Sequence, residues 1–315
     1  MVSRIRTYTE DSGRELTFEG FLAWYHLTPA DIYSKSVTFS RLCVEAGVRE
    51  DFTEEIETTL SKVMYRFTAF DSRRWIRFLL ETLTKLVDVD YAALSPLESR
   101  MMQMLYMTIW DSYAENWNSD EVLERLYSLA ESPVLLAELL ELLRYQYNHI
   151  DFIDSATDLG FDCPLDVHCT YTQRQLLVAL DYKNFSAMRQ GVLYLPEKKI
   201  DVFLITLNKS DKDYSPTTMY EDYAISPTQF HWQSQSTTAA DSNTGRRYIT
   251  HAANGGRILL FVREFKQDRL GTSPYTFLGQ ATYVSHTSSK PMNIVWQLEK
   301  PIPAKYLRRV QQVIG

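Results

Sequence analysis

The sequence predicts an α+β protein, with an α-helical bundle over residues 1–160 and a strongly curved antiparallel sheet or barrel over residues 161–315. Three observations support this prediction. The chain has 315 residues, about twice the roughly 150 of a typical domain. Its first half has apolar residues at helical spacing and only four of the 11 glycines. Its second half consists of short β-type runs divided by Gly, Pro, Ser and Asn.

Helix starts in the first half are marked by a hydroxyl residue followed by proline. The hydroxyl is suited to the N-cap, and proline at the first helical position sacrifices no hydrogen bond. Ser95 is followed by Glu98, which completes a capping box by reaching back to the Ser95 amide. The three marked starts are Thr28-Pro29, Ser95-Pro96 and Ser132-Pro133.

One helix and seven strands are predicted in the second half. Thr172 and Gln175 form another capping box, ahead of an apolar helix that we expect to flank the sheet. The strands that follow are short and do not alternate with helices, which argues against a βαβ fold. They are predicted over residues 192–195, 200–207, 220–225, 230–236, 257–265, 275–286 and 292–298.

The composition is that of a globular protein, with 45% hydrophobic and 23% charged residues. No apolar run approaches the roughly 18 residues of a membrane span, so we expect a soluble, cytoplasmic protein. The three cysteines include no C-x-x-C pair, which fits a reducing compartment. Cys163, His168 and Cys169 are chemically suited to zinc, but a fourth ligand is not evident. We expect buried thiols there, and no metal or other cofactor.

The net charge of −7 conceals an uneven distribution. Residues 1–160 carry 15 Lys and Arg against 27 Asp and Glu, a balance of −12. Residues 161–315 carry 18 against 13, a balance of +5. An asymmetry of this kind indicates a half that binds a polyanion beside a half that does not.

Motifs of the common catalytic classes are absent from the sequence. There is no G-x-x-x-x-G-K-[ST], H-E-x-x-H or G-x-S-x-G, so we expect this chain to have no enzymatic activity of its own. Asp181-Tyr182-Lys183 and Glu197-Lys198-Lys199 match the minimal [DE]-x-K of metal-dependent nucleases. Patterns this short are common by chance, and solvated turns are the simpler interpretation.

Residues 208–236 interleave aromatic side chains with amides, lysines and a carboxylate, the components of a nucleic-acid site. Two strands that fill a core with alternate residues would give a similar pattern. Predicted base-binding residues are Tyr214, Tyr220, Asp222, Tyr223, His231, Trp232, Gln233 and Gln235. Predicted contacts to the DNA backbone are Lys209, Lys212, Arg246, Arg247, Arg257 and Arg263, with Arg246 and Arg247 placed in a loop.

The second half contains five distinctive stretches: residues 209–236, Thr-Gly-Arg-Arg-Tyr-Ile at 244–249, Ile-Leu-Leu-Phe-Val-Arg-Glu at 258–264, Phe-Leu-Gly at 277–279 and Lys-Pro-Ile-Pro at 300–303. Together they resemble the carboxyl-terminal part of bacterial superfamily 2 helicase proteins, among them SauUSI-type modification-dependent (type IV) restriction enzymes. Residues 21–48 are similar to the helical coupler that follows the motor in these proteins. The resemblance covers nearly the whole chain.

The resemblance implies a helical coupler followed by an SRA/PUA-like barrel, the fold of 5-methylcytosine readers. It also implies helicase (ATPase) and nuclease domains on the same or a partner chain, so we expect this chain to be part of a longer enzyme. We expect residues 161–315 to bind duplex DNA and to flip 5-methylcytosine or 5-hydroxymethylcytosine out of the stack. Asp222 would accept from the cytosine N4 amino group, with Tyr220, Tyr223 and Trp232 as stacking residues. Because side chains alternate along a strand, Tyr223 should point away from Asp222.

Two other functions are compatible with the sequence. The chain could be an accessory module of a helicase that binds DNA without specificity or docks on another protein. The [DE]-x-K pairs could instead belong to a nuclease.

Overall fold

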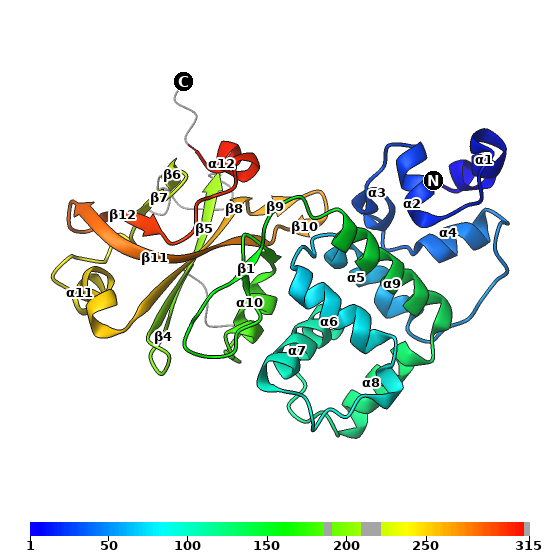
Figure 1. The fold of residues 1–315 in the computed structure, drawn as a ribbon, viewed down its shortest axis with the longest axis horizontal. Coiled ribbons are helices and arrows are strands. Elements are labelled where there is room, and N and C mark those ends of the chain that lie inside the picture. Colours follow the sequence, from blue (N-terminus) through cyan, green and yellow to red (C-terminus); the bar gives the residue numbers. More distant parts are fainter. Residues whose placement is uncertain (186–190, 209–221, 312–315) are drawn as a thin grey trace. The chain divides into compact units, whose positions relative to one another are not determined.

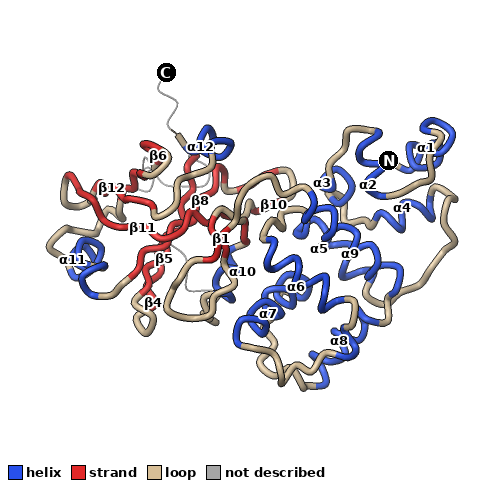
Figure 2. Tube along the Cα trace, viewed as in Figure 1, coloured by secondary structure: helices blue, strands red, loops and turns tan. Residues whose placement is uncertain are grey.

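The computed structural model describes residues 1–185, 191–208 and 222–311, and it has the predicted α+β class (Figure 1). Helices occupy the N-terminal part of the chain and the sheet lies in the C-terminal part (Figure 2). Two compact units are formed: unit 1 is Met1–Asp151 with Arg174–Lys183, and unit 2 is Phe152–Gln173 with Asn184–Gly315. Among the described residues, no helix is long and apolar enough to cross a membrane.

Unit 1 is built from helices that surround a buried central helix, α7 (Pro96–Trp110). Every residue from Met101 to Ile109 is buried, so the methionines of this helix fill the core. The other helices are α1 (Val2–Ser12), α2 (Phe18–Trp24), α3 (Pro29–Tyr33), α4 (Phe39–Glu45), α5 (Glu57–Phe67), α6 (Arg73–Leu83), the 3-10 turn η1 (Leu86–Asp88), α8 (Asp120–Ala130), α9 (Pro133–Asn148) and most of α10 (Gln173–Ala179).

The three helix starts predicted from hydroxyl-proline pairs are confirmed, since α3, α7 and α9 begin at Pro29, Pro96 and Pro133. At α7 the predicted capping box is present: the Glu98 amide donates to Ser95 Oγ at 3.3 Å, and the Ser95 amide donates to Glu98 Oε2 at 2.9 Å.

The cap of α9 differs from the prediction, because the Ser132 hydroxyl donates backwards to the Ser128 carbonyl. Glu54, about 80 residues away in the sequence, takes its place: the amides of Val134 and Leu135 donate to its carboxylate at 2.7 and 2.9 Å. The N-terminus of α9 is therefore capped by a tertiary contact.

The N-terminus of α4 is capped in the same way by a fully buried carboxylate on α9. The amides of Phe39 and Ser40 donate to Glu138 at 2.6 and 2.7 Å, and the Tyr33 hydroxyl donates to it at 3.0 Å. Burial raises the pKa of Glu138, although these three donors favour its charged form. Glu138 thus ties α3 and α4 to α9.

Helix α10 begins where it was predicted, after Thr172, but residues 174–183 group with the helical unit. The side-chain amide of Gln175 donates from Nε2 to the buried hydroxyl of Thr108 on α7 at 2.8 Å. Lys183 forms an ion pair with Glu115 at 2.8 Å. The single boundary near residue 160 therefore does not describe how this helix packs.

Unit 2 contains all seven predicted strands, with bounds that differ by a few residues at most. They are β4 (Val192–Leu195), β5 (Ile200–Asn208), β6 (Tyr223–Ser226), β7 (Gln229–Gln233), β8 (Arg257–Phe265), β11 (Tyr275–Thr287) and β12 (Asn293–Leu298). Their order in the sheet is β4-β5-β8-β11-β12-β7-β6, with β3 (Thr170–Tyr171) paired to β11. Short hairpins add β1 (Ser155–Ala156), β2 (Asp166–Val167), β9 (Gln267–Asp268) and β10 (Gly271–Thr272).

The sheet is mixed, so the prediction of a purely antiparallel sheet is wrong for one pair. Strands β5 and β8 run parallel, from Ile200 opposite Arg257 to Asn208 opposite Phe265. A parallel pair needs a long crossover, which here includes β6, β7 and the helix α11 (Asn243–Thr250). The hydrogen-bonded order of the described strands does not close into a barrel.

The sheet is nevertheless strongly curled. Three strands separate β5 from β7, so in a flat sheet they would lie about 19 Å apart, four strand spacings of about 4.8 Å. Instead, the rings of Phe203 on β5 and Trp232 on β7 stack with centroids 4.2 Å apart. The concave face therefore encloses a core, which includes Phe203, Trp232, Tyr248, Leu260, Ile294 and Trp296.

Helix α12 (Ala304–Val310) connects β8 with the last strand of the sheet, β6. The Tyr306 hydroxyl donates to the Val262 carbonyl on β8 at 3.1 Å. Gln311 forms a parallel bridge with Ala224 on β6, and Val310 packs in the concave core. The helix thus links strands that do not pair with each other.

Candidate nucleic-acid interface

Asp222 and Trp232 lie on the concave side of the curled sheet. In the register of β6 and β7, Ala224 pairs with Phe230 and both are core residues, so Asp222, two residues before Ala224, has the same orientation. Asp222 is 8% exposed, and its carboxylate accepts a hydrogen bond from the main-chain amide of Gln233 at 2.9 Å. A main-chain donor thus fixes the orientation of this carboxylate.

Trp232 is a core residue and not an exposed stacking platform. Phe203 stacks on its indole at an interplanar angle of 17°, and the edge-on ring of Tyr248 lies 5.7 Å away. This arrangement matches the core-filling alternative that the strand pattern allowed. Trp232 therefore belongs to the concave core.

Tyr223 and His231 lie on the opposite, convex face of the same two strands. They are direct cross-strand partners, and their rings stack with centroids 4.8 Å apart. The side chain of Gln233 shares this face, and its Nε2 donates to Asn293 Oδ1 on β12 at 2.9 Å. The alternation expected from the sequence is confirmed, and it divides the predicted base-binding set between two faces.

The remaining predicted base-binding residues give less information about the site. Gln235 is half-buried in the segment that follows β7. Tyr214 and Tyr220, together with the predicted backbone contacts Lys209 and Lys212, lie outside the described residues.

The segment that carries Arg246 and Arg247 is helix α11 and not the predicted loop. Ser242 caps it by accepting from the Gly245 amide at 3.0 Å. Gly245 is required at this point, because a Cβ would lie 2.1 Å from the Ala239 carbonyl oxygen. A glycine that suggested a turn thus reflects close packing inside a helix.

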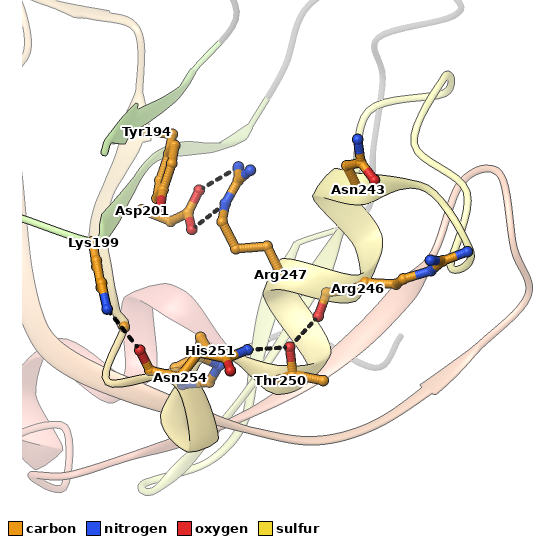
Figure 3. A pocket seen from close by; sticks show the side chains of 10 residues that line it. Tyr194, Lys199, Asp201, Asn243, Arg246, Arg247, Thr250, His251 and Asn254 are labelled. Atoms are coloured by element: carbon orange, nitrogen blue, oxygen red, sulfur yellow. Dashed lines mark hydrogen bonds and ion pairs between the residues drawn. The ribbon is translucent and has the colours of Figure 1, made fainter. Parts of the chain in front are cut away.

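Arg247 is held by protein groups. Its Nε and Nη2 donate to the two carboxylate oxygens of Asp201, each at 2.9 Å, and its guanidinium lies 3.8 Å from the ring centre of Tyr194 (Figure 3). The Asp201 side chain is only 4% exposed, and burial raises its pKa against the opposing effect of Arg247. Arg247 therefore links α11 to β4 and β5, and its fork is not available to a phosphate in this arrangement.

Among the four predicted backbone contacts that the structure describes, only Arg246 is exposed. In Figure 3 its side chain extends away from the Arg247–Asp201 pair.

Two other predicted backbone contacts, Arg263 and Arg257, pack against groups of the protein itself. Arg263 is 9% exposed and donates to Thr206 Oγ1 at 2.9 Å and to the Ser273 carbonyl at 3.1 Å. Arg257 is half-buried, with its guanidinium against Gly160.

A cavity of about 340 Å³ lies between α11 and the β4–β5 turn. Lys199 donates from the turn to the Asn254 carbonyl at 3.4 Å, and the Asn254 amide donates to the Thr250 hydroxyl at 2.9 Å (Figure 3). The negative charge of Asp201 neutralises that of Arg247. The charges of Lys199 and Arg246 are not neutralised within the lining, which is therefore positive overall. An anion such as a phosphate group suits this lining.

Sequence reasoning missed most of the polar lining of this cavity. Tyr194, Asp201, Asn243 and Asn254 come from four separate segments, which only the fold brings together. Lys199 lies in a [DE]-x-K pattern of the sequence, which does not indicate an anion site. The one signal that pointed here was the basic pair Arg246-Arg247.

Within the described residues, no group of three or more His, Cys, Asp or Glu side chains is arranged to hold a metal. Cys163 and Cys169 are both buried, as expected.

No curated protein matches the chain. Residues 165–310 match DUF3427, a domain of unknown function, and this match includes α11, the strands that form the concave core and the residues of the cationic cavity.

Proposed function

We propose that residues 161–315 are the DNA-recognition part of a modification-dependent restriction system, and that they bind duplex DNA and read 5-methylcytosine or 5-hydroxymethylcytosine by base flipping. In this proposal the curled sheet is an SRA-like half-barrel and unit 1 is the helical coupler. Helicase and nuclease domains on the same or a partner chain supply the catalytic steps. The resemblance of the sequence to SauUSI-type enzymes supports this assignment.

The observation that carries the proposal is the Asp222 carboxylate beside Trp232 at the concave face. A carboxylate accepts a hydrogen bond from the N4 amino group of cytosine and repels the O4 of thymine. Flipping a base costs a few kcal/mol, and stacking on an aromatic ring other than Trp232, which Phe203 covers, would offset roughly 1–3 kcal/mol of that cost. Burying a methyl group against apolar walls adds about 0.8 kcal/mol, which corresponds to about a fourfold preference for the methylated base.

The cationic cavity supplies the second component, a contact to the DNA backbone. Arg246 and Lys199 are its cations, and α11 connects it to the concave core through Tyr248, whose ring contacts those of Phe203 and Trp232. A phosphate held there positions the duplex without adding sequence information.

Binding without base specificity is the second candidate. Phe203 already covers one face of Trp232, and Tyr223 and His231 lie on the opposite face from Asp222. A polar, aromatic convex face with a cationic cavity would suffice for an accessory module that holds DNA.

Asp222→Ala tests the reader proposal. We expect it to weaken binding to a duplex with one 5-methylcytosine by about 1–3 kcal/mol, because the contact to the base edge is lost. The preference over a duplex with thymine at the same position should disappear, because both bases carry the 5-methyl group and differ at the edge that Asp222 contacts. His231→Ala changes the opposite face of the same strands and should leave the preference intact. If Asp222→Ala retained the full preference in fluorescence anisotropy titrations, Asp222 would not read the base.

Arg246→Ala tests the backbone contact. We expect weaker binding to every duplex and a slope of log K against log salt that is smaller by about 0.9, the value for one phosphate contact. Lys62→Ala removes the same charge from an exposed site on α5 and should not change the slope. An unchanged slope for Arg246→Ala would show that Arg246 does not contact a phosphate.

A further inference from the structure

A second cavity, of about 210 Å³, lies in unit 1 between α8 and the segment that starts at η1. Leu86, Val89, Leu123 and Leu126 form its apolar walls. Val87 and Tyr127 stand beside it with 59% and 46% of their surfaces exposed, although both are large apolar side chains. Exposed apolar residues that flank an apolar cavity are typical of a surface that another molecule covers.

Tyr91 lines this cavity, and its hydroxyl lacks a hydrogen-bond partner in the described structure. The Tyr91 hydroxyl is buried and has no hydrogen-bond partner among the described residues, while its ring stacks on Trp117 with centroids 5.4 Å apart. Burial raises the pKa of Tyr91 to about 12, so the group is a neutral O–H donor. Buried hydroxyls are normally satisfied, so a local opening at Tyr91 would make this donor available to an acceptor.

Most charged side chains around the cavity are acidic, although Lys85 precedes η1 and Arg125 on α8 pairs with Glu121. Asp90 lines it, Asp88 belongs to η1, and Asp120 and Glu124 lie on α8 within one turn of Leu123 or Tyr127. Within the described part of the chain, none of these four carboxylates forms an ion pair with a lysine or arginine. Such a rim repels nucleic acid and anionic lipid and attracts a cationic partner.

We propose that this cavity docks a segment of a partner protein in which two adjacent large apolar side chains are flanked by lysine or arginine. One of the apolar side chains fills the cavity between Leu86 and Leu123, a main-chain carbonyl of the segment accepts from the Tyr91 hydroxyl, and the flanking cations lie against the acidic rim. This proposal concerns unit 1 only, so it stands or falls independently of DNA recognition by unit 2.

The test uses the full chain and three synthetic peptides, followed by methyl NMR of leucine and valine. Acetyl-Lys-Lys-Leu-Phe-Lys-Lys-amide should cause saturable shifts at Val87, Val89 and Leu123. Acetyl-Lys-Lys-Ala-Ala-Lys-Lys-amide should bind at least fivefold more weakly, and acetyl-Glu-Glu-Leu-Phe-Glu-Glu-amide should not saturate. Equal affinity of the two lysine peptides, or shifts that avoid these three residues, would overturn the proposal.

Two variants separate docking from folding. Tyr91→Phe should lower affinity for the Lys-Leu-Phe peptide by about fivefold, because one hydrogen bond contributes about 1 kcal/mol. Its melting temperature should not fall, since the hydroxyl has no partner in the described structure. Glu124→Lys should weaken the same peptide, whereas Glu10→Lys on α1, with the same change of charge, should not. Unchanged binding by both Tyr91→Phe and Glu124→Lys would contradict docking at this cavity.

Discussion

Arg247→Ala is expected to lower the free energy of unfolding by about 3 kcal/mol, one of the two largest single-residue effects that we predict. Asp201 has a side chain that is 4% exposed, and both of its carboxylate oxygens accept from Arg247 at 2.9 Å. Removing Arg247 leaves this buried carboxylate without its cation and uncovers the ring of Tyr194. Urea denaturation of wild type and variant measures the difference.

Arg246→Ala is the matched control for this prediction, because the neighbouring arginine is exposed. Its effect on stability should be within about 0.5 kcal/mol. If Arg246→Ala destabilised the protein as much as Arg247→Ala, the Arg247–Asp201 pair would not be the cause.

The effect of Arg247→Ala should also depend on pH. The pKa of Asp201 is raised on folding, so its contribution to stability is present at low pH and is lost as pH rises through the folded pKa. Arg247 opposes the rise in the pKa of Asp201 through its positive charge and hydrogen bonds. In Arg247→Ala the pKa of Asp201 in the folded protein should therefore be higher still. The destabilisation should therefore be smaller near pH 4 than near pH 7.5. A larger effect at the lower pH would contradict this account.

Glu138→Ala is expected to cost at least about 3 kcal/mol, the other large effect. Three donors converge on this carboxylate, and two of them are main-chain amides at the start of α4 that have lost contact with water. Each buried donor left without an acceptor costs about 1–3 kcal/mol. Glu10→Ala, on exposed α1, should change stability by less than about 0.5 kcal/mol in the same denaturation measurement.

Glu138→Gln separates the charge of this residue from its hydrogen bonds. Because burial raises the folded pKa of Glu138, the stabilisation is greatest below the unfolded pKa and decreases as pH rises through the folded value. Glutamine does not titrate, so the stability difference between wild type and Glu138→Gln should be larger near pH 4 than near pH 8. A difference that grew with pH would show that the carboxylate is held in its charged form.

Local sequence patterns predicted the secondary structure well. Hydroxyl-proline pairs gave the starts of three helices, because both residues act on the helix end that contains them. Runs of β-forming residues gave seven strands for the same reason. Helix α11 was missed because Gly245 resembles a turn residue, and only the approach of Ala239 explains why glycine stands there.

Features that depend on partners distant in the sequence were not predictable. Glu54 and Glu138 cap helices about 80 and 100 residues away, and nothing near them in the sequence indicates this. The parallel pairing of β5 with β8 depends on how the chain crosses between them. In the same way, the sequence predicts Arg247 and Arg263 as phosphate contacts, because it does not indicate that Asp201 and Thr206 bind their guanidinium groups.

The candidate site was predictable as a set of residues and only partly as an arrangement. Strand alternation correctly separated Tyr223 from Asp222. It could not reveal that Trp232 packs on Phe203, because the curl of the sheet brings together strands that are far apart in its order.

The most direct test of the reader proposal is the affinity of the full chain for two duplexes that differ by one methyl group. Both are measured at the same salt concentration, because phosphate contacts make every affinity depend on salt. The proposal predicts at least about fourfold tighter binding to the duplex with 5-methylcytosine, the value expected from burial of one methyl group. Equal affinity for this pair, and for the corresponding 5-hydroxymethylcytosine duplex, would contradict it and leave a DNA-binding module without base specificity.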